Sequence, residues 1–276
     1  MVSLSNHEVR ASLHLQRARG TGRITVKLRD GQAAIDTLYQ EGCAKIRLPH
    51  THDDSLQAVM INTAGGLCGG DDLRWQADAA AGTRVVLTTP ACERVYRSTG
   101  SAARVANRLA VGRRARLHWL PQETILFENS RLDRTLEVDL AEDATLVALE
   151  TVLLGREARG ETARRATLAD NWRVRRNGRL LHAEVTRLTG SVLERDGAAL
   201  LGGANALATL LYVGADSGRL LEPVRALLNG RSAASVIGER LVVRALAGSG
   251  QELRRHIIPA LQLLCGQTPL PRLWHL

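Results

Sequence analysis

Two carboxylates at the exit of a glycine-rich segment are the first residues whose types and spacing suggest chemistry. The segment "INTAGGLCGGDD" occupies residues 61–72, and Asp71 and Asp72 follow its last glycine directly. Adjacent carboxylates can hold a divalent cation, because hard oxygen ligands suit such ions. They can also act as an acid and a base. The structural alternative is a tight turn in which glycine accepts the backbone angles and the aspartates hydrogen-bond the turn. On its own, the segment favours the turn.

The same segment lacks the signatures of nucleotide binding. It contains no Lys-Ser or Lys-Thr pair after its glycines, and it does not follow the G-x-G-x-x-G pattern. Those motifs place phosphates on backbone N–H groups. Two aspartates at the exit would repel phosphate, so a phosphate-binding loop is excluded here.

Glu150 is a third carboxylate of interest, because it lies in the apolar run "LVALETVLLG". A buried carboxylate without a partner is costly, so it needs a counter-ion, a raised pKa or an internal polar space. An ion pair with an arginine such as Arg156 is the plain interpretation. A carboxylate lining a water-filled passage is the functional one.

Evidence for an enzyme is thin beyond these carboxylates. His50 and His52 share a face only if their segment is a strand, and Pro49 with the polar run after them predicts an exposed loop instead. The sequence contains no G-x-S-x-G or H-E-x-x-H motif. Nothing in one dimension joins a serine, cysteine or histidine into a catalytic triad.

Composition predicts a globular protein with macromolecular partners. The net charge is +9, and 35 of the 37 basic residues are arginines, scattered rather than clustered. A nucleic-acid binder more often gathers basic and aromatic residues together, whereas arginines are common in protein interfaces. The four cysteines form no C-x-x-C motif. The sequence shows neither a secretory signal nor an apolar run of about 18 residues, so we expect a cytoplasmic protein that does not enter a membrane.

Residues from about 20 to 190 read mainly as strands. Three stretches resemble one another, beginning at Gly82, Arg114 and Asp143, and each has a small or polar entry followed by a short apolar strand. Regular spacing of this kind predicts stacked β-layers in which each unit covers its neighbour, although a plain β-sandwich is also compatible.

Residues from about 200 to 267 show a different pattern of apolar and polar residues. Residues 203–214 and 217–230 show helical spacing, and 238–249 resembles a strand. Residues 249–267 predict an amphipathic helix with Ser249 as N-cap, Glu252 three residues later and a kink at Pro259. We therefore predict one domain over 1–276, mainly β, with a stacked-strand, β-helix-like body and a smaller C-terminal α/β element.

Several segments together resemble the urease accessory protein UreD family, called UreH in some systems. They occur in the family's order between residues 61 and 274: "INTAGGLCGGD" (61–71), "ERVYRS" (93–98), "WLPQETILF" (119–127), "LLGREARGE" (153–161), "NWRVRRNGRLL" (171–181) and "PRLW" (271–274). No single segment is decisive, but six in order make the resemblance specific.

The resemblance implies a non-enzymatic factor that binds apo-urease before its nickel centre is assembled. The family works with a helical accessory protein, UreF, and a nickel-carrying GTPase, UreG. It implies no tightly bound cofactor; nickel is in transit through an internal passage. Asp71, Asp72 and Glu150 fall on acidic positions of the family pattern, and we expect them to line that passage. Oxygen ligands suit transit, because stronger His or Cys ligation would trap the ion.

Partner-binding residues are expected in the arginine-bearing segments and at the carboxyl end: Tyr96, Arg97, Arg156, Arg272 and Trp274. The alternative is that these residues act within the fold. Two positions depart from the family pattern, Cys68 in the glycine segment and Cys92 in "TTPACERVYRS". They could approach each other, Cys68 could add a soft ligand, or both could simply replace small buried residues.

Two other classes of function compete with urease maturation. One is a hydrolase-like enzyme that uses Asp71 and Glu150 as acid and base, which lacks an accompanying nucleophile or cofactor motif. The other is an arginine-driven nucleic-acid-binding protein, whose binding would fall steeply with added salt.

Overall fold

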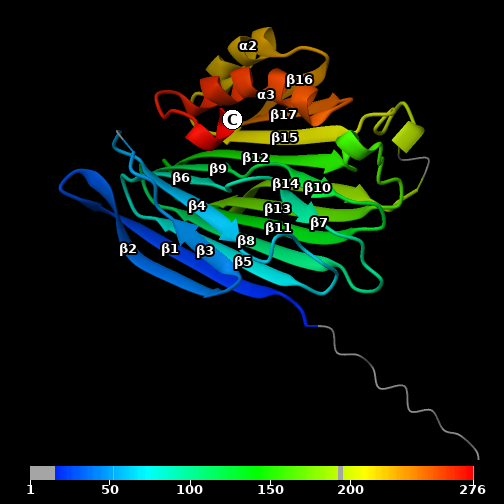
Figure 1. The fold of residues 1–276 in the computed structure, drawn as a ribbon. Helices are drawn as coiled ribbons and strands as arrows, with labels where there is room; N and C mark the ends of the chain where they lie inside the picture. The colour runs from blue at the N-terminus through cyan, green and yellow to red at the C-terminus, as the bar shows by residue number, and fades with distance from the viewer. Residues whose placement is uncertain (1–15, 52, 192–194, 276) are drawn as a thin grey trace, which may run out of the picture.

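Two β-sheets stacked face to face form most of the protein in a computed structural model, which describes residues 16–51, 53–191 and 195–275 (Figure 1). The seven-stranded sheet contains, in spatial order, β14 (Arg179–Leu188), β13 (Thr167–Arg176), β11 (Arg131–Leu140), β8 (Ala103–Val111), β5 (Asp72–Ala79), β1 (Arg19–Arg29) and β2 (Gln32–Gly42).

The ten-stranded sheet lies against it. Its main path is β16 (Arg231–Ile237), β17 (Arg240–Ala247), β15 (Ala206–Val213), β12 (Thr145–Leu154), β9 (Arg116–Leu120), β6 (Arg84–Thr88), β4 (Leu56–Asn62) and β3 (Ala44–Arg47). Two short strands, β7 (Glu93–Val95) and β10 (Thr124–Leu126), pair in parallel beside β12.

The centre of the molecule is a stack of similar coils. Each coil places one strand in the seven-stranded sheet and the next main strand in the other sheet, as β5 and β6, β8 and β9, and β11 and β12 do. Neighbouring coils pair in parallel, with Arg84 opposite Arg116 and Arg116 opposite Thr145. These strands begin within the three similar stretches at Gly82, Arg114 and Asp143. The prediction of a mainly β, stacked-strand body is confirmed.

Strict alternation of side chains separates an inner face from an outer face. Along β5, Leu73, Trp75 and Ala77 are buried between the sheets while Arg74 faces outward, as the two-residue period of a strand requires. Gly22, opposite Trp75 in β1, has no room for a side chain, since a Cβ there would lie 2.3 Å from the indole ring. The core is therefore built from aliphatic side chains and a few tryptophans.

The carboxyl-terminal element covers the outer face of the ten-stranded sheet. Helices α2 (Ser217–Leu227) and α3 (Gly250–Cys265) lie over β15, β16 and β17 in Figure 1 and form a second apolar cluster with them. The predicted helix over 203–214 is wrong, because residues 206–213 form β15 between β12 and β17. The run is buried on both faces there, and such an apolar run satisfies either structure in one dimension.

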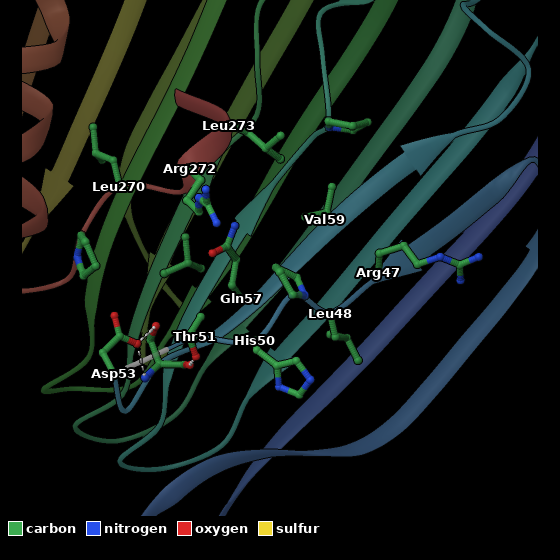
Figure 2. A pocket seen from close by; sticks show the side chains of 15 residues that line it. Arg47, Leu48, His50, Thr51, Asp53, Gln57, Val59, Leu270, Arg272 and Leu273 are labelled. Atoms are coloured by element: carbon green, nitrogen blue, oxygen red, sulfur yellow. Dashed lines mark hydrogen bonds between the residues drawn. The ribbon is translucent and has the colours of Figure 1, made fainter. Parts of the chain in front are cut away.

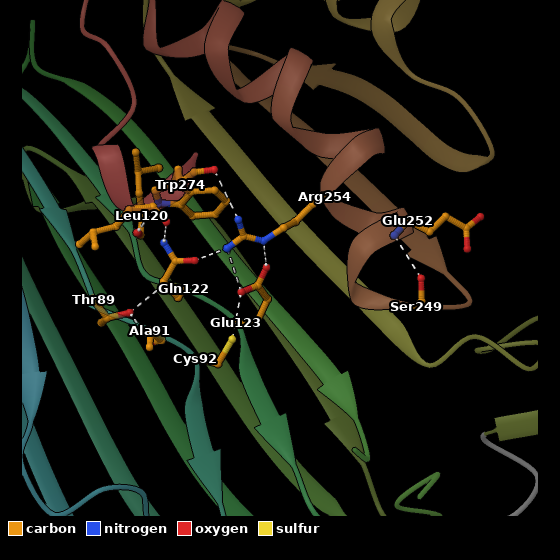
Figure 3. A network of polar contacts seen from close by, with 11 residues as sticks. Thr89, Ala91, Cys92, Leu120, Gln122, Glu123, Ser249, Glu252, Arg254 and Trp274 are labelled. Carbon is orange, nitrogen blue, oxygen red and sulfur yellow. Dashed lines mark hydrogen bonds and ion pairs between the residues drawn. The ribbon is translucent and has the colours of Figure 1, made fainter. Parts of the chain in front are cut away.

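Helix α3 begins and is anchored as its sequence predicts. The Ser249 hydroxyl accepts a hydrogen bond from the N–H of Glu252 at 3.1 Å, and Pro259 lies inside the helix. Arg254 then ties α3 to the body: its Nε lies 2.5 Å from a carboxylate oxygen of Glu123, and it also donates to Gln122 (Figure 3). None of the described helices is long and apolar enough to cross a membrane.

Candidate functional site

A small polar cavity of about 50 Å³ lies between the two sheets. Apolar side chains such as Leu67, Leu73 and Trp75 form much of its wall. The polar side chains that line it are Glu93, Glu150, Arg134, Asn107, Gln122, Thr89 and Thr124. A buried water needs roughly 10–15 Å³ of such space and several polar partners. The cavity therefore has room for a few waters.

Glu150 enters this cavity from β12 and is part of a buried ionic network. One carboxylate oxygen accepts a hydrogen bond from Trp119 Nε1 at 2.9 Å, and the other accepts from Arg134. Arg134, in β11 of the opposite sheet, also contacts Asp170 at 2.7 Å and Thr124 at 3.1 Å. The counter-ion of Glu150 is thus Arg134 rather than Arg156. Burial raises the pKa of Glu150, and Arg134 opposes that shift.

Glu93 is the second carboxylate of the cavity. It starts β7, and its carboxylate accepts hydrogen bonds from the Asn62 side-chain amide, 3.2 Å from one oxygen, and from the backbone N–H of Arg94. Burial raises the pKa of Glu93 to about 7, against the effect of the Asn62 hydrogen bond. No arginine neutralises it among the ion pairs of the described residues. At neutral pH this carboxyl group exchanges readily between its protonated and ionised forms.

The network has more negative than positive groups. Glu150 and Asp170 pair with one guanidinium, that of Arg134, and Glu93 lines the same cavity as Glu150. With all three acids ionised, the excess is two negative charges, the charge that one divalent cation balances. Excess charge in a low-dielectric interior is compensated either by protons or by a cation. The raised pKa values of Glu93 and Glu150 agree with compensation by protons.

The glycine segment folds as a tight turn, and Asp71 holds it in place. Asp71 is buried, and its two carboxylate oxygens accept hydrogen bonds from the N–H groups of Ala18 at 2.8 Å and Cys68 at 2.7 Å. Gly70 has a φ of 90°, and a Cβ on Gly69 would lie 2.0 Å from the Ser98 hydroxyl. The turn interpretation describes this segment, with Asp71 as its side-chain acceptor.

Asp72 lies on the other face of the sheet. As the first residue of β5 it points outward, and both of its oxygens lie 2.8 Å from nitrogens of Arg74. The hydrogen bonds from Arg74 hold the pKa of Asp72 below its usual value. Neither Asp71 nor Asp72 is among the residues that line the Glu150 cavity. The structure thus does not bring the three acidic candidates into one cavity.

Tyr96 and Arg156 meet through an aromatic ring. The Tyr96 ring contacts Phe127 edge to face with centroids 5.1 Å apart, and the Arg156 guanidinium lies 4.5 Å from the Phe127 centroid. Tyr96 also donates its hydroxyl proton to the carbonyl of Gly65, and Arg156 pairs with Glu161 at 2.6 Å. This cluster packs the glycine turn against the segment that follows β12.

Arg272 is exposed at a groove of about 780 Å³ on the outer side of the protein (Figure 2). Leu48, Val59, Leu270 and Leu273 are among its lining residues, and Arg47 and His50 add basic groups. The Asp53 carboxylate is engaged by the N–H and hydroxyl of Ser55. Apolar concave surfaces of this kind are typical of contacts with other proteins.

The other candidates divide between surface and interior. Arg97 is exposed beside the turn. Trp274 is 2% exposed, donates from Nε1 to the carbonyl of Leu120 at 3.2 Å and lies under the Arg254 guanidinium (Figure 3). Its ring is therefore part of the core.

All four cysteines are free thiols. Cys92 donates to a carboxylate oxygen of Glu123 at 3.3 Å, and burial raises its pKa to about 11, so it remains protonated. In the described parts of the chain, no three His, Cys, Asp or Glu residues are grouped so that they could hold a metal ion.

Comparison with known proteins decides the family. The family model described as "UreD urease accessory protein" matches residues 18–275. The chain belongs to the UreD urease accessory protein family. It is similar to the urease accessory protein UreD of Chelativorans sp. (strain BNC1), 58% identical over 262 residues that cover 94% of this chain and 95% of that protein. It is also similar to UreD of Rhizobium leguminosarum bv. viciae, 50% identical over 270 residues, or 97% and 99% of the two chains.

Membership of the UreD family confirms the resemblance that the six ordered segments carry and supports a role in urease maturation.

The cavity adds two residues that sequence reasoning missed. Glu93 is the first residue of the "ERVYRS" segment, and its place in that segment is the one feature of the sequence that could have pointed to it. Arg134 gave no signal, because an arginine in a strand with alternating charges reads as solvent-facing until the opposite sheet is known.

Proposed function

We propose that this UreD-family protein is a non-enzymatic maturation factor that binds apo-urease and passes nickel toward the urease active site. In this proposal nickel is cargo and crosses the interior at the cavity lined by Glu93 and Glu150. The helical protein UreF and the GTPase UreG act as its partners in the cytoplasm. The exposed Arg97 and Arg272 are the best placed of the candidate partner contacts.

The observation that supports the proposal is that two carboxylates, the buried Glu150 and the half-buried Glu93, line one cavity between the sheets. Oxygen ligands bind Ni²⁺ more weakly than imidazole or thiolate groups do, so an ion held by carboxylates and water can leave again. Rings and pairs of charged groups lower the barrier for an ion without creating a deep trap.

The test is nickel incorporation in cells that express urease with its accessory proteins. Glu93→Gln combined with Glu150→Gln keeps the volume of both side chains and removes two charges. We expect at least a several-fold loss of nickel per urease active site, measured by elemental analysis of purified urease, with the urease complex still recovered by pull-down. Asp139→Asn is the matched control, because Asp139 is an exposed carboxylate on the outer face.

Three outcomes separate the interpretations. Full nickel occupancy with the double variant would contradict passage through the cavity. Loss of the urease complex itself would assign the two carboxylates to structure. Full urease activation in cells that lack this chain would overturn the maturation role.

A further inference from the structure

A hollow on the outer face of the seven-stranded sheet is ringed by arginines, and we call it the arginine hollow. It has a volume of about 610 Å³ and lies over β1, β5, β8 and β11. Four arginines line it: Arg23, Arg74, Arg104 and Arg108. It lies on the face of the sheet opposite to the buried cavity, and nothing in the nickel proposal uses it.

The register of the strands explains the hollow. Ala106 on β8 lies opposite Arg74 on β5 and opposite Thr135 on β11. Arg104 and Arg108 flank Ala106 two positions away on the same strand and the same face. Residues two apart on a strand are separated by about 6.6 Å, and neighbouring strands by about 4.8 Å. Three long cationic side chains therefore surround one methyl group, which leaves space above Ala106.

The charges in the arginine hollow are only partly paired. Asp72 holds Arg74, and Glu137 lies 3.2 Å from Arg108. The guanidinium groups of Arg23 and Arg104 form no hydrogen bond or ion pair with the residues that the structure describes. Of the lining residues, four are arginines and two, Asp72 and Asp133, are acids. The hollow is a rigid, positively charged surface with free guanidinium groups.

We propose that the arginine hollow binds carboxylate side chains on an acidic surface of the urease apoprotein, an inference that rests on the function proposed above. A guanidinium binds a carboxylate through two parallel hydrogen bonds. The interleaved acids Asp72, Asp133 and Glu137 oppose the continuous negative charge of a nucleic acid. Separate carboxylates on a folded protein fit between them, and the flat sheet face suits a broad protein surface.

The test measures binding of the purified full-length chain to purified urease apoprotein at low and at moderate salt. Ala106→Glu places a carboxylate inside the hollow, where it occupies the guanidinium groups itself, and Ala106→Gln is the neutral control of nearly equal size. Arg104→Glu removes a free guanidinium. Arg187→Glu makes the same charge change on the same face at β14, three strands away.

We expect Ala106→Glu and Arg104→Glu to weaken binding at least tenfold at low salt. Ala106→Gln and Arg187→Glu should stay within about threefold of the parent, since electrostatic contacts act locally once salt screens them. Thermal unfolding of each variant verifies that the fold is intact. Tenfold weakening by Arg187→Glu as well would indicate a general charge effect and overturn the assignment of the hollow.

The two proposals fail in different ways. If the parent chain binds apo-urease and all four variants bind equally well, the hollow is not the contact while the maturation role stands. If the parent chain does not bind apo-urease at all, the proposed function fails and the hollow proposal falls with it.

Discussion

At the scale of single residues, the surroundings of each carboxylate decide its role. Asp71 receives two backbone N–H groups and acts as a structural acceptor. Glu93 accepts from the Asn62 amide and from the N–H of Arg94, but it faces a cavity and burial disfavours its charge. Both are acidic residues near the same glycine turn, yet Asp71 holds the turn through two backbone N–H groups, whereas burial disfavours the charge of Glu93. This difference can be measured.

Asp71→Ala is expected to destabilise the protein by roughly 2–4 kcal/mol, because hydrogen bonds to a charged acceptor contribute about 1.5–3 kcal/mol each. The variant leaves the N–H groups of Ala18 and Cys68 without their acceptor. Urea denaturation measures the free energy of unfolding. Asp72→Ala is the adjacent control and should change it by less than about 1 kcal/mol, since Asp72 pairs only with Arg74 on the surface. Equal effects of the two changes would contradict the structural role of Asp71.

Glu93→Gln should stabilise the protein at pH 8 and not at acidic pH. The pKa of Glu93 is raised from 4.5 to about 7 in the folded state, so between these values the folded state binds more protons than the unfolded state. The free energy of unfolding of the parent therefore falls as pH rises through this window. Removing the charge should recover roughly 1–3 kcal/mol at pH 8 and little at pH 4.5.

Denaturant midpoints at several pH values test this difference between Glu93→Gln and the parent. The exposed Glu142→Gln change serves as the control for loss of one negative charge. A stability gain that does not depend on pH would show that Glu93 is not the titrating group.

At the scale of elements, local signals predicted the coils because each coil is a local repeat. The stretches from Gly82, Arg114 and Asp143 each contain their own turn and their own short apolar strand, so one window of sequence predicts one layer. The N-cap at Ser249 was predicted for the same reason, because donor and acceptor lie three residues apart.

The errors and omissions come from contacts that are distant in sequence. Residues 203–214 were predicted as a helix, but β12 and β17 on either side make them a central strand. Glu150 was predicted to need a counter-ion, yet its partner Arg134 comes from the opposite sheet. The presence of a buried charge can be inferred locally, whereas its partner depends on how the sheets stack.

Arg254 is the main polar link between α3 and the body, and Arg254→Met is expected to loosen that helix. Glu123 is only 3% exposed. Burial alone would raise its pKa, but the hydrogen bond and charge of Arg254 keep the pKa of Glu123 below its usual value. Removing the guanidinium leaves a buried carboxylate without its counter-ion, at a cost of about 3–5 kcal/mol.

Hydrogen exchange of the α3 amides and the free energy of unfolding measure this loss. The double variant Arg254→Met/Glu123→Leu removes both charges and should recover most of the stability, as replaced buried ion pairs often do. If the double variant were as unstable as the single one, packing of the arginine rather than its charge would explain the effect.

At the scale of the whole molecule, a buried ionic network joins the two sheets across an otherwise apolar interior. Arg134 and Asp170 belong to the seven-stranded sheet, and Glu150 and Trp119 belong to the ten-stranded sheet. The arginine hollow lies on the outer face of the seven-stranded sheet, and the carboxyl-terminal element covers the outer face of the ten-stranded sheet (Figure 1). The network thus joins the two sheets beside the cavity proposed for nickel.

Arg134→Met tests how strongly this network holds the sheets together. The variant leaves Glu150 and Asp170 buried without a counter-ion, so we expect a loss of about 3–5 kcal/mol at pH 8. The loss should shrink at pH 5, because burial raises the pKa of Glu150 and its protonation relieves the uncompensated charge. The triple variant Arg134→Met/Glu150→Gln/Asp170→Asn carries no charge in the network and should regain most of the stability at pH 8. Denaturation followed by tryptophan fluorescence, with Trp119 beside Glu150 as a probe, measures the free energy of unfolding of all three proteins. If the Arg134→Met variant were as stable as the parent at pH 8, apolar packing alone would hold the sheets together.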